Sequence, residues 1–219
     1  MLKAVIFDMD GVIVDSEPLH HKAYQKMFSD FDLTVSKELY ESFTGQATMA
    51  ICERLCGTFN LDYEPQLLVN QKRKHFSLLF DEDHEFCLIE GVLDLIKDYH
   101  QSGLNLVLAS SASMQNINRI FKRFDLDPYF KAKLSGADLK ASKPHPEIFI
   151  NAAKAAGVSP TECFVIEDST NGIIAAKEAN IFCIAYKSEN SKDQDYSRAD
   201  LLISDYNVIK YDTVKDLFN

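Results

Sequence analysis

The stretch Leu2-Lys3-Ala4-Val5-Ile6-Phe7-Asp8-Met9-Asp10-Gly11 decides the fold. Its first six residues are mostly apolar and favour β structure, a pattern typical of a strand buried on both faces of a parallel sheet. Asp8 and Asp10 follow at the carboxyl end of that strand, which is where open α/β sheets bind their ligands. Gly11 permits the tight turn that brings both carboxylates to this edge.

Two carboxylates so close together repel each other unless a cation neutralises them or one of them takes a proton. Each outcome is chemically useful. Mg²⁺ prefers hard oxygen ligands, a carboxylate can attack phosphorus, and a second carboxyl group can exchange a proton with a leaving group. The structural alternative is a polar strand end that only caps the next helix. Asp-x-Asp-Gly between two apolar runs is more specific than that alternative requires.

Composition excludes several classes of function. The 219 residues are 46% hydrophobic, which is enough to bury a core, and the net charge of −10 argues against a nucleic-acid partner. We expect no membrane partner, because no apolar stretch approaches the length of a membrane span, and no signal peptide, because Asp8 interrupts the apolar start. The five cysteines are expected to be reduced thiols. We therefore expect a cytoplasmic protein, and a monomer.

The apolar pattern divides the chain into two parts. Residues 16–86 carry apolar residues at helical spacing and no strand signal, which predicts an all-helical domain. Within it, Gly57 is expected to end one helix and Pro65 to begin the next. Strands and helices then alternate, which predicts a parallel sheet covered on both faces. We therefore expect an α/β fold: a doubly wound parallel sheet formed by residues 1–15 and 87–219, interrupted by the inserted helical domain.

Three further strand ends carry polar residues suited to the same chemistry. Ser110 and Ser111 follow a predicted strand at a helix entry, where a hydroxyl and free N–H groups can hold a phosphate; alternatively they only cap the helix. Lys143 precedes a helix that begins at a proline, and it either points a fixed ammonium at the site or is an exposed lysine. Glu167 and Asp168 end another buried strand, either as metal ligands or as acidic residues favoured at a helix N-terminus.

These residues resemble the motifs of a known family. Asp8-x-Asp10-Gly11-x-x-x-Asp15 resembles the first motif of the haloacid dehalogenase-like phosphotransferases, and Ser16-Glu17-Pro18-Leu19-His20 resembles the branch that holds β-phosphoglucomutase and small sugar-phosphate phosphatases. Ser110, the string Lys143-Pro144-His145-Pro146-Glu147-Ile148-Phe149 and Glu167-Asp168-Ser169-x-x-Gly172 resemble the second, third and fourth motifs, in the family's order. The resemblance implies the fold described above, with residues 16–86 as a helical cap.

The resemblance also implies phosphoryl transfer through an aspartyl-phosphate intermediate. Asp8 would attack the phosphoryl group, and Asp10 would donate a proton to the leaving oxygen and later accept one from water. Ser110 and Lys143 would hold the phosphoryl oxygens and offset their charge. The presence of Asp10 argues against a dehalogenase. Cleavage of a carbon–halogen bond needs the first aspartate, but it has no alkoxide leaving group and so needs no second aspartate as an acid.

Mg²⁺ is the cofactor that the resemblance implies. Its ligands would be Asp8, the backbone carbonyl of Asp10 and Asp168, with Glu167 in a supporting position. The ion would neutralise charge that develops on the phosphoryl group.

The cap would select the substrate, a small phosphorylated metabolite. By resemblance, the substrate-binding residues beyond Ser110, Ser111 and Lys143 would be His20, Gly45, Gln46, Thr48 and Lys74. His20 would link the cap to Asp10. The alternatives are a surface histidine at position 20 and a solvated helix face at Lys72–Lys74.

Thr48 decides between two activities. β-Phosphoglucomutases have an arginine at this position, three residues after the glycine of the cap loop, and it grips the second phosphate of a bisphosphate. Threonine cannot do so, and we therefore expect a phosphatase acting on small phosphomonoesters such as sugar phosphates. The alternative is a β-phosphoglucomutase that interconverts β-glucose 1-phosphate and glucose 6-phosphate. A non-catalytic binding protein and a phospho-acceptor receiver domain fit less well with intact motifs and a helical insert.

Overall fold

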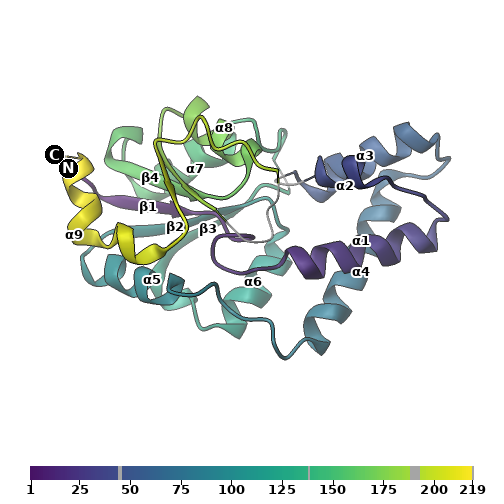
Figure 1. Cartoon of the computed structure of the whole chain (residues 1–219), viewed down its shortest axis with the longest axis horizontal. Helices are drawn as coiled ribbons and strands as arrows, with labels where there is room; N and C mark the ends of the chain where they lie inside the picture. Colours follow the sequence, from purple (N-terminus) through teal and green to yellow (C-terminus); the bar gives the residue numbers. More distant parts are fainter. Residues whose placement is uncertain (44–45, 138, 188–192, 219) are drawn as a thin grey trace.

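The computed structural model describes residues 1–43, 46–137, 139–187 and 193–218. At its centre lies a six-stranded parallel sheet in the order β3-β2-β1-β4-β5-β6 (Figure 1). The strands are β1 Ala4–Phe7, β2 Asn105–Ser110, β3 Phe130–Ser135, β4 Cys163–Glu167, β5 Phe182–Tyr186 and β6 Leu201–Ile203. This is the doubly wound α/β fold that the sequence predicts.

The central position of β1 explains where the polar residues gather. All four residues of β1 are apolar and buried, as a strand in the middle of a parallel sheet requires. Phe7 is in register with Leu108 of β2 on one side and with Ile166 of β4 on the other. Because these three parallel strands end at the same edge, the polar residues that follow them come together there.

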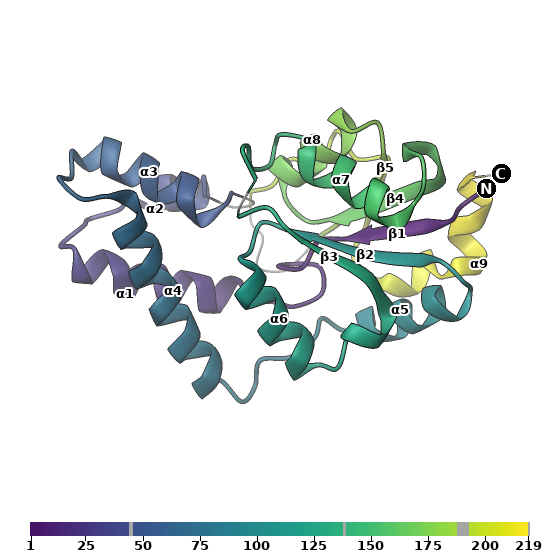
Figure 2. The same ribbon diagram turned by 180° about the vertical axis from the view of Figure 1, so that it is seen from behind.

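Helices cover both faces of the sheet (Figure 1 and Figure 2). Ala4 and Ile6 of β1 belong to the apolar cluster under α7 and α8, whereas Val5 and Phe7 belong to the cluster under α5 and α6. The helices of this domain are α5 Val92–Gln101, α6 Met114–Arg123, α7 Glu147–Ala156, α8 Thr170–Glu178 and α9 Tyr211–Val214, with short 3₁₀ segments at Asp127–Tyr129, Pro160–Glu162, Tyr206–Ile209 and Lys215–Phe218. In the described ranges, no helix is long and apolar enough to span a membrane.

Four further helices, termed the cap helices, are inserted between β1 and α5 and lie beyond the carboxyl edge of the sheet (Figure 2). They are α1 Glu17–Asp30, α2 Lys37–Glu41, α3 Thr48–Phe59 and α4 Pro65–Glu82. They enclose an apolar core of their own, which includes Met27, Leu55 and Leu68. The helical insert is as predicted, and the domain boundaries at residues 15/16 and 86/87 stay a prediction.

One helix end expected from the sequence is wrong. The helix α3 continues through Gly57 and ends at Phe59, and Asn60 then adopts the left-handed conformation with a φ of 49°. A Cβ at Gly57 would meet no described atom within 4 Å, so no close contact requires glycine there. Asparagine tolerates left-handed backbone better than most residues, which explains why it ends the helix instead.

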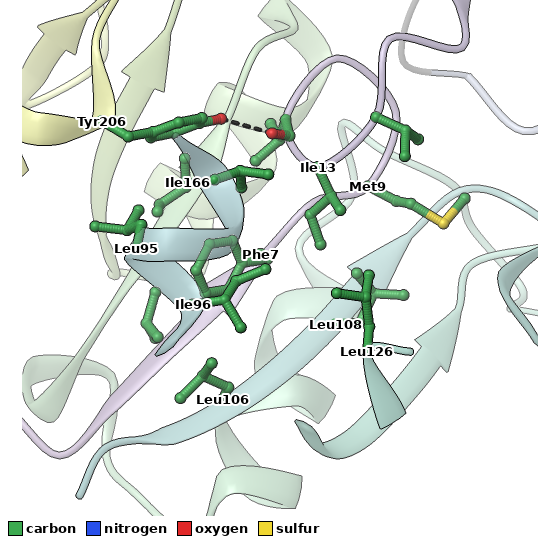
Figure 3. Close-up of a cluster of buried hydrophobic side chains, with 14 of the residues drawn as sticks. Phe7, Met9, Ile13, Leu95, Ile96, Leu106, Leu108, Leu126, Ile166 and Tyr206 are labelled. Atoms are coloured by element: carbon green, nitrogen blue, oxygen red, sulfur yellow. Dashed lines mark hydrogen bonds between the residues drawn. The ribbon is translucent and has the colours of Figure 1, made fainter. Parts of the chain in front are cut away.

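The loop that follows β1 is anchored in the core. Met9 is fully buried and belongs to the same apolar cluster as Phe7 (Figure 3). From the C-terminal part of the chain, the Tyr206 hydroxyl donates a hydrogen bond of 2.6 Å to the carbonyl oxygen of Val12 (Figure 3). The two acidic residues that flank Met9 therefore project from a well-supported loop, as a precise binding site requires.

Candidate active site

Four carboxylates meet at the carboxyl edge of the sheet. Asp8 and Asp10 follow β1, Glu167 ends β4 and Asp168 comes next, and all four line one cavity beneath the cap helices. Gly11 permits this close approach: its φ is 82°, and a Cβ at this position would lie 2.0 Å from Asp168 Oδ2. Any larger residue at position 11 would force the Asp168 carboxylate to move.

Lys143 supplies positive charge among these groups. Its Nζ donates to Asp8 Oδ1 and Glu167 Oε1, both at 2.6 Å, and to the carbonyl oxygen of Ala109 at 3.2 Å. Burial favours the neutral amine, but the two carboxylates outweigh burial and hold the pKa of Lys143 above its ordinary value. The structure therefore places a buried, charged lysine beside Asp8.

The charge of Asp8 is incompletely compensated. Burial raises the pKa of Asp8 to about 7; Lys143 opposes this rise, and Glu167 and Asp10 add to it. Lys143 alone cannot neutralise four neighbouring carboxylates. A divalent cation at this edge would offset the surplus negative charge and favour the anionic form of Asp8.

The donor groups of the site fit a Mg²⁺ ion whose ligands come partly from the protein and partly from water and substrate phosphate. Among the described residues, no three acidic, histidine or cysteine side chains form a ready metal cluster. Mg²⁺ does not need one, because it is commonly held by one or two carboxylates together with water and substrate phosphate. Asp8 and Asp168 are the two side chains that could serve in this way.

Glu167, which the resemblance places in support of the metal ligands, is held by other groups of the protein. Its Oε1 accepts from Lys143 at 2.6 Å, and its Oε2 accepts from the backbone N–H groups of Asp168 and Ser169 at 2.9 and 2.8 Å. Both oxygens are thus engaged within the protein. Glu167 therefore orients Lys143 and the turn after β4, contacts that the motif alone did not specify.

Asp10 is engaged by the cap. Its Oδ1 accepts a hydrogen bond from the Ser16 hydroxyl and lies 3.5 Å from His20 Nε2. Burial would raise the pKa of Asp10, but His20, Ser16 and Lys72 together lower it below its ordinary value. The predicted link between His20 and Asp10 is present. These contacts involve the side chain of Asp10, and the metal contact expected of its backbone carbonyl stays a prediction.

His20 also contacts Lys72 of α4, a residue that the sequence did not single out. Lys72 Nζ lies 2.6 Å from His20 Nδ1, and 4.8 and 5.1 Å from the ring centres of Tyr24 and Phe76. Burial lowers the pKa of Lys72 to about 8, although Asp10 opposes the shift. The series Asp10, His20 and Lys72 thus connects the sheet edge to the cap.

The structure does not bring Lys74, a predicted substrate contact, to the cavity. Lys74 is exposed, and the cavity wall formed by the described residues includes Lys72 and Arg73 instead. Residues two apart do not share a helix face, and Lys72 lies on the buried face with Val69 and Phe76. The three- and four-residue spacing of those apolar neighbours is the signal that could have selected Lys72.

The other predicted residues fall into three groups. Gln46, Thr48 and Ser111 line the cavity. Ser110 is fully buried, and its hydroxyl accepts a 3.0 Å hydrogen bond from the backbone N–H two residues further on, so it shapes the turn after β2. Gly45 lies outside the described residues.

Arg119 of α6 joins the sheet domain to the cap beside the cavity that it also lines. Its Nη1 donates to Ser77 Oγ at 2.5 Å, and its guanidinium forms an ion pair with Asp81; both partners belong to α4. These partners lie 42 and 38 residues away along the chain. No local sequence pattern could therefore have indicated this contact.

A parallel α/β sheet with an acidic, lysine-containing site at its carboxyl edge and a helical cap inserted after its first strand defines the class of protein. The model of the haloacid dehalogenase-like hydrolase family matches residues 5–186, and the chain belongs to this family of enzymes.

Individual relatives support this assignment. The chain is 30% identical over 184 residues to a phosphorylated carbohydrates phosphatase of Thermotoga maritima, covering 82% of each chain. It is 30% identical over 217 residues to hexitol phosphatase B of Escherichia coli, covering 98% of this chain and 96% of the relative. The structure of a β-phosphoglucomutase from Clostridium difficile superposes with a TM-score of 0.86 at 27% identity, covering 100% of this chain and 98% of that one.

Proposed function

We propose that this chain is a Mg²⁺-dependent phosphatase that hydrolyses small phosphomonoesters, such as sugar phosphates, through a phosphorylated Asp8. The observation that carries the proposal is the position of Asp8 at the end of the central strand, with Lys143 Nζ 2.6 Å from its Oδ1. The names of two relatives, a phosphorylated carbohydrates phosphatase and a hexitol phosphatase, support the substrate class.

Asp8 carries the phosphoryl group in this proposal. Its carboxylate forms a bond to phosphorus as the bond to the leaving oxygen breaks, and water later attacks the phosphorus and releases inorganic phosphate. Lys143 offsets charge on both the nucleophile and the phosphoryl oxygens. Such electrostatic stabilisation is a main part of how proteins catalyse phosphoryl transfer. A Mg²⁺ ion held by Asp8 and Asp168 would supply the remaining positive charge.

Asp10 serves as the acid and base. Its pKa lies below the ordinary value in the resting protein, and the arrival of a phosphate dianion beside it raises that pKa by charge repulsion. The protonated carboxyl then donates to the leaving oxygen, and the carboxylate later accepts a proton from water. His20 keeps the carboxyl oriented from the cap side.

Thr48 favours hydrolysis over mutase activity. It lines the cavity at the start of α3. A hydroxyl makes no bidentate contact with a second phosphate, so a bisphosphate intermediate lacks one of the grips needed to turn around and react again. A phosphatase needs only one phosphate site and water. The similarity to a β-phosphoglucomutase keeps interconversion of β-glucose 1-phosphate and glucose 6-phosphate as the second candidate.

³¹P NMR with Mg²⁺ and a panel of sugar phosphates tests the proposal. The panel includes β-glucose 1-phosphate with a trace of glucose 1,6-bisphosphate. Growth of free phosphate supports a phosphatase, and the fastest substrate identifies the class. Interconversion of the 1- and 6-phosphates without free phosphate would make the enzyme a mutase, and the interpretation of Thr48 would be wrong.

Two variants test the assigned roles. Asp8→Asn is expected to abolish turnover and keep the fold, because the amide is nearly isosteric with the carboxylate but is not a nucleophile. Asp10→Ala is expected to slow alkyl phosphates more than aryl phosphates, because only poor leaving groups need an acid. Equal losses for the two substrate types would remove Asp10 from the acid role.

A further inference from the structure

The cap helix α4 is attached to the rest of the site at two points. Near its middle, Phe76 stacks on His20 with ring centres 4.5 Å apart, and Lys72 contacts the same imidazole at 2.6 Å. His20 in turn lies beside Asp10. Toward its C-terminal end, α4 is held by Arg119 from the sheet domain. A helix is stiff over this distance, so the second attachment sets where the first one lies.

Arg119 makes a set of contacts with the last turns of α4. Its guanidinium donates to Ser77 Oγ at 2.5 Å and to the Ser77 carbonyl oxygen at 3.3 Å. It also pairs with Asp81 and lies 4.7 Å from the ring centre of Phe80. Positions 77, 80 and 81, which lie on one side of the helix at three- and four-residue spacing, are thus held by one side chain. Such a fork-shaped donor fixes both the rotation and the height of the helix.

The neighbouring arginine plays a different part. Arg123, one turn further along α6, donates to the carbonyl oxygens of Phe80, Asp83 and Phe86 at 3.0, 2.5 and 3.1 Å. These backbone groups belong to the end of α4 and to the segment that returns to the sheet domain. Arg123 therefore fixes the point at which the cap is joined to the sheet domain, whereas Arg119 acts closer to the cavity.

The attachment of α4 through Arg119 is one that can be released, because its ion pair with Asp81 is exposed to water. The side chains of Arg119 and Asp81 are 24% and 65% exposed, so their ion pair forms in contact with water. Ion pairs of this kind are weak and can break and re-form readily. Arg119 is thus suited to a contact that opens to admit substrate and closes again.

We propose that Arg119 is a positioning residue that holds α4 closed over the carboxyl edge of the sheet, so that Lys72 and His20 reach Asp10. It acts through α4 and touches no reacting group. The inference rests on the proposed phosphatase activity. It adds to that activity the contact that couples closure of the cap to the acid function of Asp10.

Kinetics of Arg119→Met test the inference, with Lys122→Met as the matched control. Lys122 is an exposed cation on the same helix. Arg119→Met is expected to lower kcat/KM for an alkyl sugar phosphate about tenfold, and to change p-nitrophenyl phosphate turnover much less, because an aryl leaving group does not need Asp10. Lys122→Met is expected to match the native protein on both substrates. A purely structural defect would reduce both substrates equally and would overturn the inference.

The partner residue and a direct measurement of closure complete the test. Asp81→Asn is expected to reproduce the substrate-dependent loss, and the double variant to show less than the product of the two single effects, because both remove one contact. Arg119→Lys, which keeps the charge, should recover part of the activity. Solution X-ray scattering should show a larger radius of gyration for Arg119→Met than for Lys122→Met. Equal radii would overturn the inference; no turnover by the native protein would overturn the proposed function with it.

Discussion

Asp8 links the stability of the metal-free protein to pH. Burial raises its pKa from the ordinary value of 3.8 to about 7. A carboxyl with a higher pKa in the folded state binds more protons when folded, so its favourable contribution is complete below the unfolded pKa and is lost as pH rises through the folded pKa. At about 1.4 kcal/mol per pKa unit, the free energy of unfolding should lose about 3 kcal/mol between about pH 5 and pH 8 from Asp8 alone.

Urea unfolding of the native chain and of Asp8→Asn at both pH values, with a chelator present, measures this loss. Asn removes the titrating group, so the stability of Asp8→Asn relative to the native chain should rise by about 3 kcal/mol from the lower to the higher pH. Asp62→Asn, which removes an exposed carboxyl, serves as the control and should follow the native chain.

Addition of Mg²⁺ at the higher pH extends the experiment. The ion should stabilise the native chain more than Asp8→Asn, because it binds the anionic carboxylate only in the folded state. Parallel pH dependences of the native chain and Asp8→Asn without metal would refute the argument that Asp8 is buried with insufficient compensating charge.

Three further substitutions have expected outcomes. Tyr206→Phe should lower the free energy of unfolding by about 1–2 kcal/mol in urea, because it leaves a buried carbonyl oxygen in the loop after β1 without its donor; an unchanged midpoint would show that this bond does not anchor the loop. Gly11→Ala should weaken Mg²⁺ binding, measured by calorimetry, about tenfold or more, because its Cβ would displace Asp168; unchanged affinity would remove Asp168 from the metal site. Arg123→Met should lower the free energy of unfolding by about 2 kcal/mol, as three carbonyl oxygens lose a charged donor; a midpoint equal to that of Lys122→Met would contradict this role.

The parts of the fold that depend on residues close together along the chain could be predicted from the sequence. The apolar run before Asp8 indicates a buried central strand, and parallel strands place their following residues at a common edge. Asp168 could therefore be assigned to the same site as Asp8 without any knowledge of distances, whereas the assignment of Lys143 depended on its resemblance to a family motif. The helical spacing of residues 16–86 likewise predicts the cap helices.

The parts that depend on side-chain direction could not be predicted so directly. Lys72 and Lys74 share one basic run, and only the phase of the helix, set by its apolar residues, shows that Lys72 faces the cavity. The motif supplies an acidic residue at position 167, but its use for Lys143 and the backbone follows from burial. Arg119 depends on contacts with a distant helix, which no local pattern reveals.

Detection of a phosphoryl group on Asp8 tests the central claim most directly. The protein is mixed with Mg²⁺ and its fastest sugar phosphate, quenched in acid at successive short times, digested and analysed by mass spectrometry. The account predicts a transient mass increase of one phosphoryl group on the peptide that contains Asp8, dependent on Mg²⁺ and absent from Asp8→Asn. Accumulation of free phosphate with the phosphoryl group on another residue, or undiminished turnover by Asp8→Asn, would contradict it.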